Sequence, residues 1–338
     1  MGAGTAQGGA CLLISGKVRK NMEFVVFAGV LLLLFIFMIV QELIQTKNQE
    51  KLFKKYLREN YGKEPPKEYS LERFARLGSY LERHKEEKQL DDITWNDLGM
   101  DEVFRRIDRT YSAAGEEYLY YTLRNISCGR EALEHLEEVV NWLQEQENIK
   151  VRIQLLMKRL GHLGKYSLYD YLDNLDYLGE RSNRKIVLGN LLYLPFLLLL
   201  FVQPAMGTIG IVLCMLWHIM TYFREKKVIE PYIISFAYVL RLIDVCEELE
   251  KQKIPVYRRE LDELREALKS LRELRRGAYW VMAGNQGKIG GNPLDILADY
   301  LRMILHLDIF QFNRMLEKLR KKTGQVETML AITGYLDM

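Results

Sequence analysis

The chain has 338 residues, of which 49% are apolar, 28% charged and 11% aromatic. This composition excludes a disordered, collagen-like or disulfide-stapled protein, because enough apolar side chains are present to form a packed core. The 48 basic residues face 45 acidic ones, so the net charge of +3 is too small to favour nucleic-acid binding through bulk electrostatics. The four cysteines are far apart and lack CxxC spacing, which argues against a zinc ribbon or a redox motif.

The first apolar segment predicts a transmembrane helix over residues 24–43. Phe24 to Val40 carries no charge, and a helix needs about 20 apolar residues to cross a bilayer. Residues 1–23 form an N-terminal extension, and no small-residue cleavage site follows the apolar run. We therefore expect an uncleaved anchor rather than a removed signal peptide. Met22, directly before the span, is an alternative start of the chain.

A second apolar segment, residues 186–223, predicts a transmembrane helical hairpin. It is twice as long as one span, and Gln203, Pro204 and Ala205 divide it near its centre. Basic residues lie on both outer flanks and none lies in the connector. The flanking basic residues are Arg181, Arg184, Lys185, Arg224, Lys226 and Lys227. The positive-inside rule places the connector outside the cell. The sequence thus predicts a multi-pass cell-membrane protein with three spans and cytoplasmic helical parts.

The remaining sequence predicts helices and almost no strands, so the expected fold class is all-α. Residues 44–90 are strongly charged, are interrupted by two prolines and should form juxtamembrane helices. Residues 91–185 and 224–338 carry apolar side chains at helical spacing, and Val228 to Gln252 should form a long helix that Pro255 ends. One stripe is typical of a helix-packing seam: Leu261, Leu264, Leu268, Leu271 and Leu274. We expect segments 91–179 and 224–338 to pack together as one domain, with the hairpin as an insertion and with Leu119 and Leu123 in the core.

No catalytic, cofactor or metal site is predicted in this chain. The loop from Gly284 to Gly291 is the nearest feature to a phosphate cradle. However, Met282 stands at the first Gly position of the phosphate-binding motif, and Ile289 stands where the magnesium-holding Ser or Thr belongs. We therefore expect this loop to connect two helices, and we expect the chain alone not to bind ATP.

Two sets of polar residues could have a function, but a structural role is the favoured interpretation for each. Three carboxylates, Asp170, Asp173 and Asp176, are spaced three apart and could bind a metal, but a solvated helix face is the favoured interpretation. Asn190 and His218 lie inside the predicted spans, where polar residues can mark a transport path. Both are near a cytoplasmic end, which favours a structural role. The five histidines never pair at metal-ligand spacing.

Residues 107–123 carry a distinctive turn followed by a Leu-rich helix. The turn reads Ile-Asp-Arg-Thr-Tyr-Ser-Ala-Ala-Gly, and its marked positions are Asp108, Thr110, Ser112, Gly115, Leu119 and Leu123. It resembles the opening of the core, or lever, domain of the MutS family of DNA mismatch repair ATPases, where an Asp-x-Thr-x-Thr-x-x-Gly turn leads into such a helix. The expected helices at 133–143, 149–160 and 330–337 are similar in order to helices of that domain. The similarity covers about 91–179 and 224–338.

The resemblance implies a MutS-like helical core interrupted by a membrane hairpin. It also implies a homodimer or an ATPase-bearing partner, ATP-driven lever movement, and DNA contact in the complete protein. ATP and magnesium would bind in the family's ATPase domain, whose motifs this chain lacks. Glu117 stands where the family usually has Arg, and a membrane anchor replaces the mismatch-recognition domain. We therefore expect the lever portion of a MutS-like ATPase, truncated near Met338 or separately encoded, without a role in mismatch repair.

Two other classes of function remain open. A membrane scaffold or signalling adaptor would use the same helices for protein–protein contacts alone. A transporter subunit would depend on the polar intramembrane positions. A downstream reading frame that encodes a phosphate-binding loop would favour the MutS-like interpretation over both.

Overall fold

The computed structural model describes residues 36–63 apart from 38 and 42, residue 69, and residues 71–86, 88–125, 129–164, 166–275 and 293–338. These residues form helices joined by short turns, and no β-strand occurs among them, so the all-α prediction is confirmed for this part of the chain. The chain divides into two compact units, Met1–Tyr61 and Gly62–Met338. Most of the expected first span, at 24–43, lies outside the described residues. In the first unit, residues 43–59 are helical.

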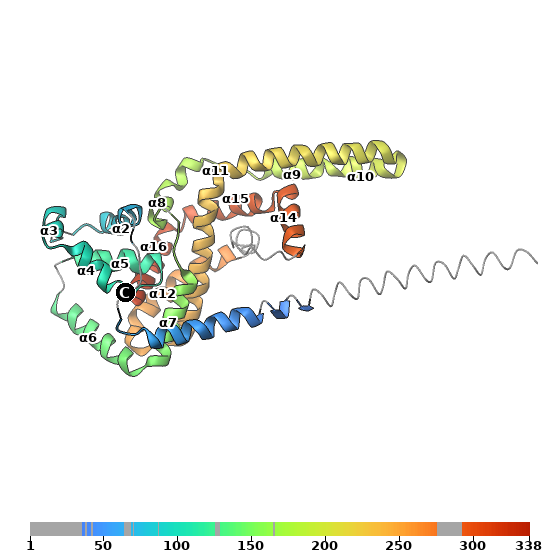
Figure 1. Cartoon of the computed structure of the whole chain (residues 1–338). Helices are drawn as coiled ribbons and strands as arrows, with labels where there is room; N and C mark the ends of the chain where they lie inside the picture. The colour runs from blue at the N-terminus through green and yellow to red at the C-terminus, as the bar shows by residue number, and fades with distance from the viewer. Residues whose placement is uncertain are drawn as a thin grey trace, which may run out of the picture. The chain divides into compact units, whose positions relative to one another are not determined.

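The second unit is a set of helices that pack around one large apolar core (Figure 1). In chain order these are α2 (Leu71–Arg83), α3 (Asp92–Asp97), α4 (Met100–Ile107), α5 (Ala113–Arg124), α6 (Arg130–Glu145), α7 (Glu147–Leu160), α8 (Leu168–Asp173), η1 (Asn174–Leu178), α9 (Arg184–Leu191), α10 (Tyr193–Val202), α11 (Pro204–Gln252), η2 (Pro255–Tyr257), α12 (Arg258–Leu271), η3 (Arg272–Arg275), α14 (Pro293–Leu305), α15 (Leu307–Arg320) and α16 (Thr323–Asp337).

The core forms where helices from both parts of the sequence meet. Helix α16 packs against α5, α7 and α12, and α11 packs against α7 and α12. All five leucines of the predicted seam are buried, because α12 and η3 present them to this core. Helices from 91–179 and from 224–338 therefore pack on each other, as their amphipathic patterns predict. Helix α2 also packs on α5, so the compact unit includes part of the 44–90 segment predicted to be juxtamembrane.

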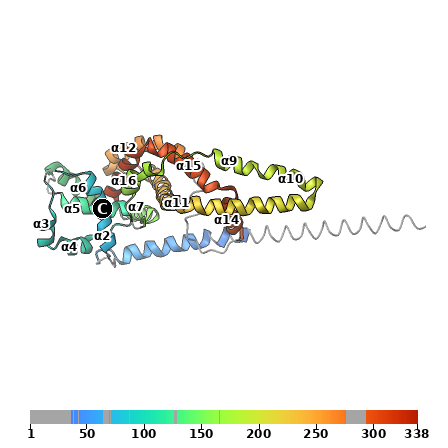
Figure 2. The same ribbon diagram turned by 90° about the horizontal axis from the view of Figure 1, so that it is seen from above.

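Helices α9 and α10 and the first part of α11 form a hairpin that projects from the other helices (Figures 1 and 2). The turn lies at Gln203, and α11 begins at Pro204, close to the predicted connector. A Cβ atom at Gly207 would lie 2.6 Å from the backbone nitrogen of Leu200, so glycine permits the close approach of the two arms. Small residues at such contacts are typical of helices packed within membranes.

Helix α11 continues without a break from the hairpin into the core. The hydropathy pattern predicts that the hairpin ends at Phe223 and that another helix starts at Val228, but this division is wrong, because one helix contains both residues. Hydropathy changes between these residues, but neither glycine nor proline interrupts them, so the helix has no reason to end there. Pro231 lies inside α11 and cannot donate the usual backbone hydrogen bond. Figure 1 shows that α11 changes direction between its hairpin half and its core half.

Two described segments are long and apolar enough to cross a membrane, Arg184–Val202 and the helix Pro204–Gln252. This criterion rests on length and composition. Side chains near the hairpin turn are strongly exposed, with Phe201 89% and Val202 78% accessible. The hairpin therefore presents apolar side chains that the described part of the chain does not cover.

Candidate functional site

The turn between α4 and α5 is held by its own side chains. Oδ1 of Asp108 accepts hydrogen bonds from the backbone nitrogen of Thr110 at 2.9 Å and from its hydroxyl at 2.6 Å. Asp108 and Thr110 are both buried. An aspartate that binds the backbone two residues onward fixes a tight turn. The first two marked positions of the motif therefore determine the direction from which the chain enters α5.

Ser112 caps the N-terminus of α5 and also reaches the end of α16. Its Oγ accepts a hydrogen bond from the backbone nitrogen of Gly115 at 3.1 Å, as is usual for a serine N-cap. The same hydroxyl donates to Oδ2 of Asp337 over 2.6 Å. One side chain therefore begins one helix and binds the end of another.

The carboxylate of Asp337 also accepts hydrogen bonds from two backbone N–H groups of the turn. The backbone nitrogen of Ser112 lies 2.8 Å from Oδ2, and that of Tyr111 lies 3.1 Å from both oxygens. The N-terminus of a helix favours a negative charge, and hydrogen bonds to an ionised acceptor are stronger than neutral ones. We call the contact of Tyr111 and Ser112 with Asp337 the α5–α16 clasp.

Two glycines let α5 and α16 approach closely enough for the clasp to form. A Cβ atom at Gly115 would lie 2.7 Å from Cγ of Asp337, and one at Gly334 would lie 2.6 Å from the carbonyl oxygen of Ala114. Real Cβ atoms do not tolerate such contacts without a shift of their neighbours. The glycine of the motif therefore makes room for the carboxylate of α16.

The next turn of α5 carries a buried ion-pair cluster. Glu116 is completely buried, and Nη2 of Arg76 lies 2.7 Å from its Oε2. Arg73 also pairs with this carboxylate, and Nδ1 of His162 lies 3.6 Å from it. Arg76 also donates to the carbonyl oxygen of Leu163 at 3.2 Å. The cluster ties α2 and the loop after α7 to α5 beside the clasp.

Glu117 is the position at which the motif departs from the MutS pattern. Its carboxyl is buried and accepts a hydrogen bond from the hydroxyl of Ser167 at 2.8 Å. Burial raises the pKa of Glu117 to about 8, although the bond from Ser167 and the charge of Arg76 oppose the shift. At neutral pH this side chain is therefore mostly a neutral acid, which burial tolerates better than an unpaired charge.

The two leucines of the motif have different surroundings. Leu119 is buried in a smaller cluster with Leu77, Trp95 and Phe104, as predicted. Leu123 is only partly buried at the edge of that cluster, so its expected core position needs correction. It lies one turn further along α5, where the helix approaches its end at Arg124. Arg124, the last residue of α5, is buried against Trp95 and Tyr120, so the last turn still packs on this cluster through its other face.

The three spaced carboxylates serve three separate contacts. Asp170 completes a capping box with Ser167 at the start of α8, Asp173 pairs with Arg83, and Asp176 lies 3.5 Å from the guanidinium of Arg320. No group of three or more metal-ligating side chains occurs in the part of the chain that the structure describes. The Gly284 to Gly291 loop lies outside the described residues.

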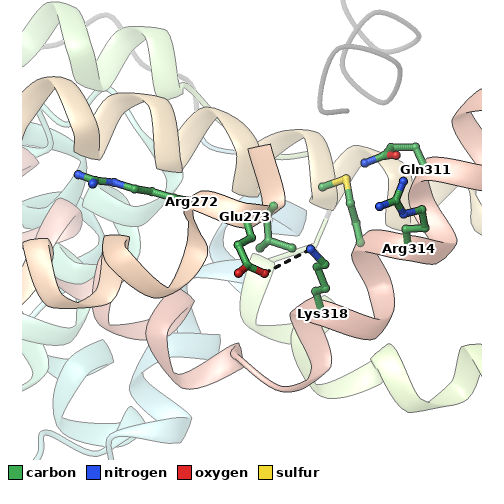
Figure 3. A pocket seen from close by; sticks show the side chains of 7 residues that line it. Arg272, Glu273, Gln311, Arg314 and Lys318 are labelled. Atoms are coloured by element: carbon green, nitrogen blue, oxygen red, sulfur yellow. Dashed lines mark hydrogen bonds and ion pairs between the residues drawn. The ribbon is translucent and has the colours of Figure 1, made fainter. Parts of the chain in front are cut away.

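A cavity of about 400 Å³ lies between η3 and α15 (Figure 3). The side chain of Lys318 lies 3.3 Å from Oε2 of Glu273 across it. Arg272 lies 3.5 Å from Glu250, so two of the cations at this cavity already have acidic partners. This arrangement stabilises the packing of η3 on α15 and does not form a convergent binding site.

Sequence reasoning identified the turn but not its partner. The segment 330–337 was assigned to a helix of the same domain, yet neither Asp337 nor Gly334 was recognised as a contact of the motif. Asp337 stands three residues after the spacer glycine Gly334, but no local pattern identifies it as the partner of the turn. No family model, curated protein or solved structure matches this chain.

Proposed function

We propose that this chain is the membrane-tethered lever portion of a MutS-like ATPase, which transmits conformational change between a nucleotide-binding partner and the membrane. The observation that carries the proposal is the α5–α16 clasp. The motif that resembles the start of the MutS lever binds the helix that, in that family, leads toward the ATPase domain. The motif thus occupies a position suited to coupling rather than to catalysis.

A continuous path for such coupling runs through packed helices. Helix α16 packs on α5 and on α11, and α11 extends into the apolar hairpin. A displacement at the end of α16 would change its bonds to Tyr111 and Ser112 first. The core would then carry the displacement to α11, because packed helices move as rigid elements.

The membrane tether is the second part of the proposal. Two apolar segments of suitable length, their exposed side chains and the glycine contact inside the hairpin support insertion into a bilayer. Together with the expected span at 24–43, they would make three spans with cytoplasmic helical parts. The lipid bilayer is then one partner, and a second copy of the chain or an ATPase-bearing chain is the other.

Nucleotide chemistry belongs to that partner in this proposal. ATP and magnesium would bind outside this chain, whose role is mechanical. DNA contact rests on the family resemblance alone. The nearly balanced charge favours at most weak and non-specific binding of DNA by the chain itself.

The test is to express the chain together with the reading frame that follows it and to measure Mg-ATP hydrolysis in isolated membranes. Asp337→Asn should change this hydrolysis, because it weakens the proposed coupling contact. Asp176→Asn is the matched control, because it makes the same chemical change at an exposed ion pair. No hydrolysis with the co-expressed frame, or equal effects of both substitutions, would contradict the proposal.

One observation favours the alternative of a membrane scaffold or adaptor. Helix α6 leaves Leu133 52% and Val140 45% exposed, an apolar face that a partner protein could cover. This alternative predicts that ATP has no effect on the chain or its complexes. Under it, Leu133→Glu would reduce partner binding while Asp337→Asn would not.

A further inference from the structure

A cavity of about 640 Å³ lies where the hairpin meets the rest of the second unit. Its walls come from the start of α9, from α11 near Trp217 and Arg224, and from the start of α15. Its lining includes the exposed side chains of Leu188 and Arg224, so it is accessible from the surface of the protein. It is separate from the clasp and from the ion-pair cluster of α5.

One wall of the cavity is apolar and continuous with the exposed surface of the hairpin. Leu188 is 64% exposed, and Leu192 and Trp217 are also exposed. Tryptophan is enriched where a membrane meets water, because its ring is apolar and its N–H is polar. In the membrane orientation of the proposed function, this wall would face acyl chains.

A basic wall adjoins the apolar one on the same two helices, α9 and α11. Arg181, Lys185 and Arg224 line the cavity together with the carboxylates of Glu180 and Glu225. Arg181 lies 3.3 Å from Glu225 and is therefore already paired. Lys185 and Arg224 are exposed and form no ion pair within the described part of the chain. Two cations are therefore available for an anion at the level where lipid headgroups would lie.

We propose that this cavity binds the headgroup of an anionic phospholipid, with its phosphate against Lys185 and Arg224 and its acyl chains along Leu188, Leu192 and Trp217. The proposal rests on membrane insertion of the hairpin. A small soluble anion would satisfy the basic wall but would leave the apolar wall uncovered. A zwitterionic lipid would cover the apolar wall but would bring a positive group to two unpaired cations. Basic pockets between transmembrane helices on the cytoplasmic side are known to bind anionic headgroups.

Two polar side chains of the cavity lining donate hydrogen bonds to the protein itself. The Thr221 hydroxyl donates to the carbonyl oxygen of His218 at 2.9 Å, and the Asn313 amide donates to Oδ1 of Asn183 at 2.9 Å. A Cβ atom at Gly189 would lie 3.1 Å from Nε2 of His218, so α9 already packs tightly on α11 behind the cavity. Oδ1 of Asn313 and Nδ1 of His306 have no hydrogen-bond partner among the described residues, but both atoms are buried. The exposed groups available for binding are therefore those of the basic and the apolar wall.

The experiment measures lipid binding to the full chain in detergent micelles by native mass spectrometry. Phosphatidylglycerol is the anionic probe, phosphatidylcholine is the zwitterionic one, and glycerol phosphate is the soluble one. We expect one phosphatidylglycerol to bind in preference to phosphatidylcholine, and we expect glycerol phosphate not to displace it. The double variant Lys185→Gln, Arg224→Gln should weaken phosphatidylglycerol binding at least tenfold.

The matched control is Arg184→Gln, Lys227→Gln. It removes the same charge from the same end of the hairpin, but neither residue lines the cavity. This control should bind phosphatidylglycerol within about twofold of the unmodified chain, since only general attraction changes. Equal effects of the two double variants, equal binding of both lipids, or full displacement by glycerol phosphate would overturn the assignment.

A second measurement separates this proposal from the proposed function. Protease protection of the hairpin is measured with the full chain in vesicles made of both lipids. A protected hairpin without lipid selectivity would overturn the lipid site and leave the membrane tether standing. An unprotected hairpin would overturn the tether and the lipid site together.

Discussion

Ser112 donates its hydroxyl hydrogen to the carboxylate of Asp337, 225 residues further along the chain, over 2.6 Å. The two backbone N–H groups of Tyr111 and Ser112 bind the same carboxylate. A residue near the start of the helical domain is therefore bonded to a residue of its last helix. The contact depends on backbone donors, so the identity of residue 337 controls its strength more than the identity of residue 111.

The first prediction concerns this carboxylate. Asp337→Asn replaces one oxygen by an amide donor that would face backbone donors, so we expect the free energy of unfolding to fall by about 1.5–3 kcal/mol. Urea unfolding of the full chain in detergent, followed by circular dichroism, measures the change. Asp176→Asn should cost less than about 1 kcal/mol, since its ion pair is exposed. A double-mutant cycle with Ser112→Ala should show coupling between the two positions, and simple additivity would contradict the clasp.

The second prediction compares two helical glycines. Gly115→Ala should destabilise the chain by about 1–3 kcal/mol, because the new methyl group would overlap the carboxylate of Asp337. Gly78→Ala should instead stabilise it by about 0.5–1 kcal/mol, because nothing lies within 4 Å of the new Cβ atom and alanine favours helix. Thermal or urea unfolding of both variants tests the contrast. No loss of stability in Gly115→Ala would show that α5 and α16 pack less closely than the structure indicates.

The third prediction concerns the buried ion-pair cluster. Arg76→Met leaves the carboxylate of Glu116 buried with fewer partners, so we expect a loss of about 3 kcal/mol in stability. Arg130→Met removes an arginine from an exposed pair with Glu134 and should cost less than about 1 kcal/mol. Unfolding midpoints of the two variants provide the measurement. A loss for Arg76→Met as small as that of the control would mean that Glu116 reaches water.

The fourth prediction is a pH dependence that Glu117 causes. The ordinary pKa of this carboxyl is 4.5, and burial raises it to about 8 in the folded chain. The folded chain therefore holds more protons than the unfolded chain between these pH values. Its stability should fall as the pH rises through this window, by at most about 1.4 kcal/mol per pH unit.

Glu117→Gln keeps the shape of the side chain but cannot ionise, so it should remove this part of the slope. Glu137→Gln, at an exposed position on α6, should leave the slope unchanged. Unfolding free energies at several pH values between 4.5 and 8 give the slopes. An unchanged slope in Glu117→Gln would show that the carboxyl is ionised in the folded chain.

The fifth prediction concerns the orientation of the hairpin. Reporter fusions at Pro204 and at Glu250 should report opposite compartments, because the basic residues lie on the outer flanks and not at the turn. Activity of a cytoplasmic reporter is expected only for the Glu250 fusion. The same compartment for both fusions would rule out insertion of α10 and the first part of α11 as a hairpin.

Helical segments and their buried faces could be predicted where apolar residues recur at regular helical spacing. The leucine seam of α12 repeats every three or four residues, and all five of its members are buried. The end of the hairpin could not be placed in the same way. Hydropathy indicates whether a segment lies in water or in an apolar environment, but it does not decide where a helix ends. The residues after Phe223 are good helix formers, so α11 continues past the point where hydropathy changes.

Only one of the two segments that form the candidate site, the turn before α5, could be predicted from the sequence. The resemblance to the MutS motif drew attention to the turn at Asp108, Thr110 and Ser112, and the structure shows that these side chains bind the backbone of the turn. The partner of the turn is distant in sequence, and no local pattern at Asp337 indicates it. Glu116 and Glu117 were missed as a buried pair of acids for the same reason. Their burial depends on α2 and on the segment around Ser167, which only the folded chain brings together.

The proline inside α11 has a mechanical consequence. From Pro204 to Pro231 the helix rises about 41 Å at 1.5 Å per residue. Each degree of rotation at Pro231 would therefore sweep the hairpin tip sideways by about 0.7 Å. Proline weakens the helix at one point while the residues on either side remain stiff. A bend at Pro231 would therefore displace the far end of the hairpin much further than it displaces the residues of α11 beside the proline.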